Sequence, residues 1–222
     1  MKRSIAKMAM AALLGVVGLP SDLAATSSGK TYKVTVTNLT RSQSFTSILV
    51  VSHRFAPNLL FVPGETASPE LAMLAEGGHT EPLETALSGN PRVKDTATSA
   101  GLLDPGDSTT IEVQGQIGQG RISLAAMLIP TNDAFLAAQN VRLPRGYEKV
   151  TIVVPAYDAG SEPNDEKCLS IPGPVCGGEG VSPGDGEGHV HVHAGIHGIE
   201  DLAADAYDWR NPVATISIKR SR

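Results

Sequence analysis

Alternating hydrophobic and polar positions recur along the chain and predict short β-strands. Residues 31–39 (TYKVTVTNL) set apolar side chains against polar neighbours, which is the period of a half-buried strand. Residues 48–52 are a continuous apolar run of strand length, and 121–129 (RISLAAMLI) are a longer run that ends at a proline. Further candidate strands lie at 109–114, 148–155, 189–193 and 213–219. Many short strands separated by turns are typical of an antiparallel β-sandwich, so an all-β fold is predicted.

One stretch departs from the strand period and predicts helices. Residues 68–78 (SPELAMLAEGG) begin with a serine that can cap a helix, have proline at the first helical position and end in glycine. A second short helix is predicted around residues 81–87. Because strands are predicted on both sides, the helices are expected to form a short insertion in the β-sandwich.

The first 25 residues have the pattern of an export signal. A positively charged start is followed by an apolar stretch at 8–19, which is too short to span a bilayer, and by small residues at 24–25. A buried N-terminal helix is the alternative. The remainder, 26–222, is predicted to form a single domain. Removing the signal takes away three cations and one carboxylate, which moves the formal net charge from −5 to −7.

This charge balance narrows the class of partner. An acidic chain without a run of basic residues is a poor candidate for nucleic-acid binding. No later apolar run is long enough for a transmembrane segment. The chain is therefore expected in the periplasm or outside the cell, with a cell-surface or extracellular ligand that the sequence does not identify.

The two cysteines, Cys168 and Cys176, are predicted to form a disulfide. The alternative, a redox pair, lacks the two-residue spacing of such motifs. The bridge would pin part of a long loop at about 156–188, which is rich in glycine, proline and acidic residues. Because it closes a short loop, its expected contribution to stability is below roughly 3 kcal/mol.

Two acidic stretches follow predicted strands and offer oxygen ligands. Asn132 and Asp133 come directly after the strand at 121–129, and Asp158 opens an acidic segment that extends to Glu166. Calcium takes six to eight oxygen ligands, which two loops at one end of a sandwich can supply. Ordinary turn chemistry, in which these side chains cap exposed backbone, is the alternative.

Residues 111–143 and 150–162 resemble the spondin domain, the N-terminal module of F-spondin and mindin. The corner PTNDA (130–134) and the segment YDAGSE (157–162) are similar to two motifs of that family. The likeness covers most of 31–162 and extends to bacterial secreted members. Two departures stand out: Ala134 replaces an aromatic residue, and Asn140 replaces an acidic one.

The resemblance implies a β-sandwich similar to calcium-binding, membrane-targeting domains, with an ion held by loops at one end. Carried over by position, the calcium ligands would be Glu112, Asp133 and Asn140, with Asp158 nearby. The implied function is that of an exported, calcium-binding adhesion or ligand-binding module.

A histidine-rich segment, GHVHVHAGIHGIED (188–201), offers a different metal chemistry. On a strand, His189, His191 and His193 share one face, with neighbours about 6.6 Å apart. Two adjacent imidazoles can therefore share a zinc or copper ion, with His197 as a further ligand after a turn. A periplasmic transition-metal protein is the alternative function, and imidazoles hydrogen-bonded to nearby loops are the structural one.

Nucleophilic catalysis has little support in the sequence. The chain lacks a Gly-x-Ser-x-Gly motif, and both cysteines are expected to be oxidised. No catalytic residue is predicted, and whether the protein is an enzyme stays open, with a binding role favoured.

Overall fold

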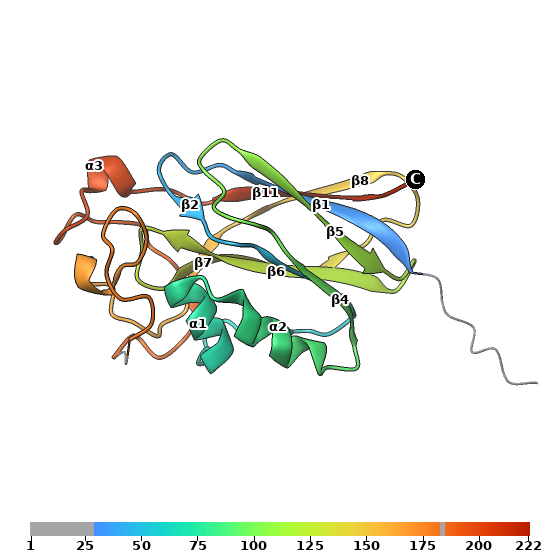
Figure 1. Cartoon of the computed structure of the whole chain (residues 1–222), viewed down its shortest axis with the longest axis horizontal. Helices are drawn as coiled ribbons and strands as arrows, with labels where there is room; N and C mark the ends of the chain where they lie inside the picture. The colour runs from blue at the N-terminus through green and yellow to red at the C-terminus, as the bar shows by residue number, and fades with distance from the viewer. Residues whose placement is uncertain (1–28, 183–184) are drawn as a thin grey trace, which may run out of the picture.

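The computed structural model describes residues 29–182 and 185–222, in which two antiparallel β-sheets pack face to face (Figure 1). The predicted export signal, residues 1–25, lies outside the described residues. Short helices and long loops complete the fold, so the predicted all-β sandwich with a helical insertion is confirmed.

The smaller sheet has four strands in the order β5-β1-β11-β8. Their bounds are Ser108–Gly115, Lys30–Asn38, Ala214–Arg220 and Lys149–Val154. Alternation along β1 buries Tyr32, Val34 and Val36 completely, while the residues between them face outward. This half-buried pattern is what the period-two sequence predicts.

The larger sheet has the order β10-β9-β7-β6-β3-β4, with the short strand β2 paired to β6. The bounds, in that order and then for β2, are His191–Val192, Ala156–Asp158, Ala134–Arg142, Gly120–Ile129, Leu49–Arg54, Val93–Thr98 and Ser44–Phe45. Strand β6 is buried on both faces: Leu124 faces the other sheet and Ala125 faces the helices. Its mostly apolar sequence follows from this double cover.

Helices α1 (Pro69–Gly77) and α2 (Thr80–Ser88) cover the outer face of the larger sheet (Figure 1). The predicted caps of α1 are confirmed: the Ser68 side chain accepts a hydrogen bond from the Leu71 amide, and Gly78 ends the helix at φ 69°. Leu71 and Leu74 belong to the apolar cluster beneath the helices. In the described residues, none of the helices is long and apolar enough to cross a membrane.

Several local expectations change. The sequence analysis did not anticipate β4, because an edge strand with few apolar residues lacks the strand period, or β7, because its alanines also suit a helix. The strand expected at 189–193 is only His191–Val192. The segment 156–188 begins with β9 and contains a 3₁₀ turn, Cys168–Ser170, and the predicted disulfide between Cys168 and Cys176.

Candidate metal centre at the acidic end of the sandwich

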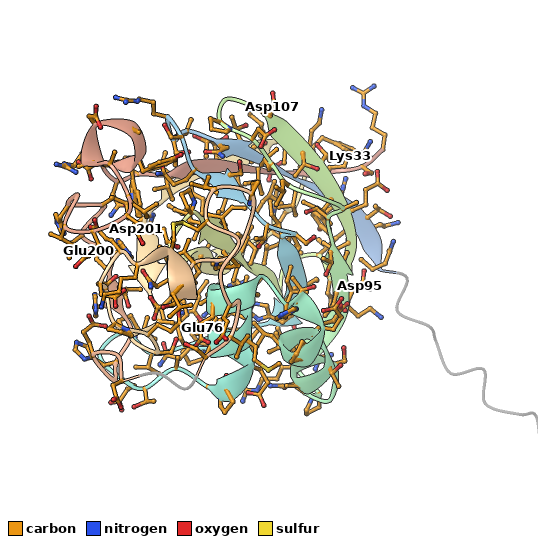
Figure 2. All side chains as sticks on the ribbon, turned by 60° about the vertical axis from the view of Figure 1, so that its left-hand side comes forward. Lys33, Glu76, Asp95, Asp107, Glu200 and Asp201 are labelled. Carbon is orange, nitrogen blue, oxygen red and sulfur yellow. A yellow bond between two sulfur atoms is a disulfide. The ribbon has the colours of Figure 1, made fainter. Side chains whose placement is uncertain are left out.

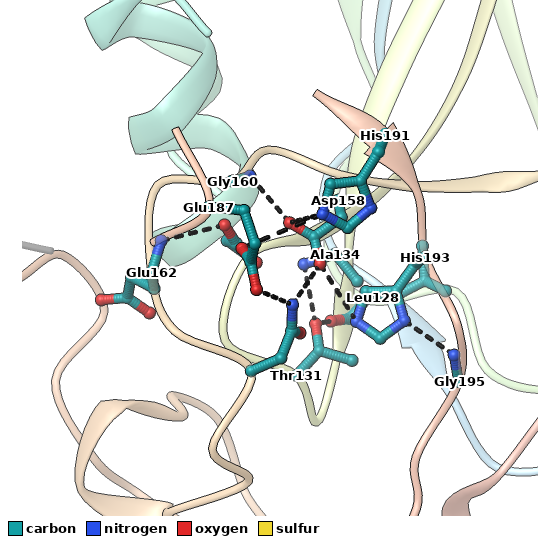
Figure 3. Close-up of polar contacts among 12 residues, drawn as sticks. Leu128, Thr131, Ala134, Asp158, Gly160, Glu162, Glu187, His191, His193 and Gly195 are labelled. Atoms are coloured by element: carbon teal, nitrogen blue, oxygen red, sulfur yellow. Dashed lines mark hydrogen bonds and ion pairs between the residues drawn. The ribbon is translucent and has the colours of Figure 1, made fainter. Parts of the chain in front are cut away.

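Carboxylates and histidines gather where β6 ends and β7 begins, a region we call the acidic end. Asp133 lies in the connection between those strands, and Asp158 closes β9, which pairs with β7. Strand β10 brings His191 directly opposite Asp158 in the ladder. The pairing of β7, β9 and β10 therefore assembles the site from three segments (Figure 3).

Asp133 is completely buried, and only one of its two carboxylate oxygens accepts hydrogen bonds from the described residues. Its Oδ2 accepts hydrogen bonds from the Ser161 amide (2.8 Å), the Ser161 hydroxyl (3.2 Å) and the Glu162 amide (3.0 Å). Its Oδ1 is buried and has no hydrogen-bond partner in the described part of the chain. Burial, and then the neighbouring charge of Asp158, raise the pKa of Asp133 to about 7. A cation beside Oδ1 would remove both costs.

Asp158 is also completely buried, and neutral donors hold both of its oxygens. The Gly160 amide donates to Oδ1 and the Asn164 side-chain amide donates to Oδ2, each at 2.7 Å. His191 Nε2 lies 3.7 Å from Oδ1, and His193 Nε2 lies 3.8 Å from Oδ2. Within the described chain, neither Asp133 nor Asp158 forms an ion pair with lysine or arginine.

The hydrogen bonds of His193 indicate which of its nitrogens carries the proton. The Gly195 amide donates to Nδ1 at 2.9 Å, so Nδ1 presents a lone pair. Burial lowers the pKa of His193, which favours the neutral ring. A neutral ring with a lone pair on Nδ1 carries its hydrogen on Nε2. That nitrogen is then a donor toward Asp158 and not a metal ligand.

His191 has the opposite arrangement. Its Nδ1 lies 3.2 Å from the Val192 carbonyl oxygen, so in the neutral ring Nδ1 carries the hydrogen and Nε2 presents a lone pair. That lone pair faces Asp158 Oδ1 and, at 3.9 Å, Glu187 Oε2. Ligand atoms of Asp158, Glu187 and His191 all lie within 4.8 Å of one another (Figure 3). Three acceptors that face one another at this distance could hold a metal ion, or a proton on His191.

Neighbouring side chains orient this group. The Asn164 amide bridges Asp158 and Glu187, with a distance of 2.9 Å to Glu187 Oε1. Beside it is a cavity of about 70 Å³, lined in part by His191, His193 and His197. Buried Glu166 holds the turn that carries His197, because its carboxylate accepts the amides of His197 (2.5 Å) and Ile199 (2.8 Å).

Glu162 contributes backbone to the site while its carboxylate points away from Asp158 (Figure 3). Oε1 accepts the Ser182 hydroxyl, and Oε2 is buried without a partner among the described residues. Burial raises the pKa of Glu162 to about 7. Its environment is therefore separate from that of Asp133, although its amide donates to that residue.

Of the four residues suggested as calcium ligands by resemblance, the structure brings together Asp133 and Asp158. Glu112 lies on β5 in the smaller sheet, where its side chain is 55% exposed and pairs with Lys33 at 3.3 Å. Asn140 lies near the far end of β7, where its amide group bonds to both backbone groups of Ala56. Both side chains serve local structure away from the acidic end.

Of the histidines predicted as transition-metal ligands, the structure likewise brings only some to the acidic carboxylates. His191 and His193 both face Asp158. His189 lies beside His191, with ring centroids 5.2 Å apart, and is exposed. Sequence reasoning missed Glu187, because it lies in a glycine-rich loop where no spacing signal marks it.

A β-sandwich with a cluster of carboxylates and histidines on the loops at one end has the architecture of a binding domain, in which a rigid scaffold holds loops that carry the site. The family model Spondin_N matches residues 24–165, and the chain therefore belongs to the spondin N-terminal domain family. This is a family of extracellular domains, and the disulfide fits an exported protein. The search of curated proteins found no match. Glu187 and His191 lie beyond the matched residues.

Proposed function

We propose that the chain is an exported ligand-binding module of the cell envelope or extracellular space that holds calcium at its acidic end through Asp133 and Asp158. The observation that supports this proposal is a pair of completely buried, adjacent carboxylates without a lysine or arginine partner in the described chain. Buried charges are normally paired or coordinate metals. A bound calcium ion would order the loops that meet a ligand.

The donor set suits a hard cation. Asp133 Oδ1 has no hydrogen-bond partner among the described residues, and the carboxylate of Asp158 lies close enough to raise the pKa of Asp133. The amide oxygen of Asn164 and loop carbonyls are the kinds of ligand that complete a calcium shell of six to eight oxygens. The tight holding of Asp158 by Gly160 and Asn164 pre-orients it for this role.

Thermal unfolding of untagged protein, in calcium and in chelator, tests the proposal. A ligand that binds only the folded state stabilises it by about 2.7 kcal/mol at 100 times its Kd. Asp133→Asn should abolish the calcium-dependent rise in Tm while leaving the protein in chelator at least as stable, because a buried charge is removed. Glu112→Gln is the matched control and should keep the full rise. An unchanged Tm in the wild type at saturating calcium would exclude the calcium site.

A second candidate is transition-metal binding by Asp158, Glu187 and His191, which would suit a periplasmic zinc or copper protein. The lone pair of His191 Nε2, aimed at two carboxylates, favours it. Zinc and copper bind both imidazole and carboxylate ligands, whereas calcium takes oxygen ligands and does not favour imidazole.

Histidine variants separate the two candidates. Metal analysis after equilibration with zinc or copper should show one ion per chain, lost in His191→Ala and kept in the neighbouring control His189→Ala. Calcium binding that survives His191→Ala while zinc or copper binding is absent would reject the second candidate. Stoichiometric zinc or copper that persists in Asp133→Asn, without any calcium response in the wild type, would reject the first.

A further inference from the structure

The opposite end of the sandwich gathers cations, and we call it the basic end: Lys30, Arg54, Arg92, Lys94 and Arg121. Lys30 opens β1, Arg54 closes β3, and Arg121 lies at the start of β6, whereas the acidic end lies beyond the end of β6 (Figure 1). Figure 2 labels Glu200 and Asp201 among the loops of the acidic end, with Lys33 and Asp95 toward the opposite end.

Two adjoining hollows lie among these side chains. The first, of about 500 Å³, is lined by Lys30, Arg54, Arg92 and Lys94 together with backbone and neutral side chains. The second, of about 550 Å³, shares Arg54 and Arg92 and adds Arg121. Neither hollow is lined by an aspartate or glutamate of the described chain. Volumes of 300–1,000 Å³ are those of ordinary ligand sites.

The arginines are held in place by neutral acceptors. Arg92 Nη1 donates to the Phe55 carbonyl at 2.8 Å, Arg121 Nη1 donates to the Gly120 carbonyl at 3.0 Å, and Arg54 Nε lies 3.4 Å from the Gln116 side-chain oxygen. A guanidinium has five N–H donors, so each keeps several free. Across residues 29–182 and 185–222, none of the basic-end cations forms an ion pair.

The acidic residue nearest in sequence to these cations is Asp95. It follows Lys94 on β4, beside an irregularity in the pairing of β3 with β4, and lies opposite Ser52. Its carboxylate accepts the Gln114 amide at 2.5 Å. Among the described residues, Asp95 forms no ion pair with a cation of the basic end, although the whole chain carries a net charge of −5.

Two further groups point to a ligand here. The Ser52 hydroxyl, on the lining of the first hollow, is buried and has no hydrogen-bond partner among the described residues. Phe55, on the lining of the second, is 55% exposed, and the Arg121 guanidinium lies 5.8 Å from its ring centroid. An exposed aromatic ring beside cations offers a ligand both an apolar face and charged donors.

We propose that the basic end binds an acidic polysaccharide, a glycan that carries sulfate or carboxylate groups. Planar guanidinium groups match the geometry of these anions and can bind them with two parallel hydrogen bonds. The cations span two hollows, so the site suits a chain with repeated charges better than one small anion. Phe55 offers an apolar face to a sugar ring, and the side chain of Gln116 offers polar contacts to sugar hydroxyls.

Fluorescence anisotropy with a labelled heparin hexasaccharide tests this proposal on untagged protein. Arg54→Gln combined with Arg92→Gln should weaken binding by at least about tenfold, because charge-assisted contacts are stronger than neutral ones. Arg41→Gln combined with Arg210→Gln changes the net charge equally at the other end and should leave the affinity unchanged. Equal losses in both double variants would reduce the interaction to net charge and overturn the proposal.

A second pair of substitutions guards against misfolding. The side chains of Lys30 and Lys94 make no hydrogen bond or ion pair in the described structure, so Lys30→Gln with Lys94→Gln should fold normally and also weaken binding severalfold. Full affinity in this variant and in the arginine variant would overturn the site. A single-stranded DNA oligomer of equal charge that binds more tightly than the hexasaccharide would overturn the ligand class.

The basic end is independent of the metal proposal. Hexasaccharide affinity should be the same in calcium and in chelator, and the same for Asp133→Asn as for the wild type. If calcium binding fails its own test, this expectation is unaffected. A loss of hexasaccharide binding in Asp133→Asn would instead place the polysaccharide at the acidic end and overturn the proposal.

Discussion

The two ends of the sandwich carry opposite charge in different ways. At the acidic end, Asp133, Asp158 and Glu166 are buried and accept hydrogen bonds from backbone amides of neighbouring loops. At the basic end, cations such as Arg54 and Lys94 project from strand ends into open hollows. One set of charges is built into the fold, whereas the other is displayed on it.

This difference separates what each end contributes. A buried carboxylate that satisfies loop amides stabilises the folded loops, because its removal leaves those donors without partners. An exposed cation without a partner contributes little to stability and, beside like charges, slightly opposes folding. Substitutions at the acidic end should therefore change the free energy of unfolding, and substitutions at the basic end should change binding with little effect on stability.

Replacing Glu166 should produce the largest loss of stability. Its carboxylate accepts two amides, those of His197 and Ile199, at a buried position. Glu166→Ala should cost about 3 kcal/mol, since hydrogen bonds to charged groups contribute about 1.5–3 kcal/mol each and the loops relax in part. Urea unfolding measures the change, with Glu200→Ala as the exposed control in the same loop region. A loss below about 1 kcal/mol would show that Glu166 does not hold this turn.

Removing the disulfide should have the next largest effect, again at the acidic end. Cys168→Ser with Cys176→Ser opens a loop with a sequence separation of 8 residues, which should cost about 2 kcal/mol through the entropy of the unfolded chain. Hydrogen exchange should increase first in the segment around residues 164–182. An increase confined to the basic end would contradict the assignment of this bridge to the acidic loops.

The strands that were predicted from sequence are those whose burial leaves a clear pattern of apolar residues in the sequence. β1 alternates because only one of its faces is buried, and β6 is mostly apolar because both faces are covered. β4 was missed because packing against its neighbours, and not its own composition, makes it a strand. The pairing of β9 with β10 joins residues more than 30 positions apart, and no local pattern encodes it.

The two ends were also unequally visible in the sequence. Asp133 and Asp158 lie in short acidic motifs at strand ends, so their role could be proposed before the structure was known. Glu112 and Asn140 were proposed by position alone, and their surroundings give them other partners. The basic end could not be proposed at all, because its residues come from four distant segments and form no basic run. Topology alone brings them together.

A pH titration sharpens the account of the acidic end. Burial raises the pKa of Glu162 to about 7, so the folded state prefers the neutral carboxyl group. In chelator, the wild type should therefore lose stability as the pH rises from about 4.5 to 7. Glu162→Gln removes the part of this loss that is due to Glu162, whereas Asp133, whose pKa is also raised to about 7, still contributes. The variant should therefore be more stable than the wild type by about 1–2 kcal/mol at pH 8, with no difference below pH 4.

Stability curves from urea unfolding at several pH values measure this difference. Glu179→Gln, at an exposed position on the same side of the molecule, should leave the pH dependence unchanged. A parallel loss of stability with pH in Glu162→Gln and in the wild type would mean that another group is responsible.

The smallest change in the free energy of unfolding is expected for Lys94→Gln, and the direction of this change distinguishes the basic end from the acidic end. Lys94 has no ion-pair partner among the described residues and lies near other cations. The substitution should change stability by less than about 0.5 kcal/mol, and at low salt it should be slightly stabilising because like charges repel.

Lys33→Gln is the matched control: it removes the pair with Glu112 and should be slightly destabilising. Differential scanning calorimetry in 20 mM and 1 M NaCl measures both, and high salt should remove both effects because the Debye length falls to about 3 Å. A loss of more than about 1 kcal/mol for Lys94→Gln would mean that the basic end, like the acidic end, is part of what holds the fold together.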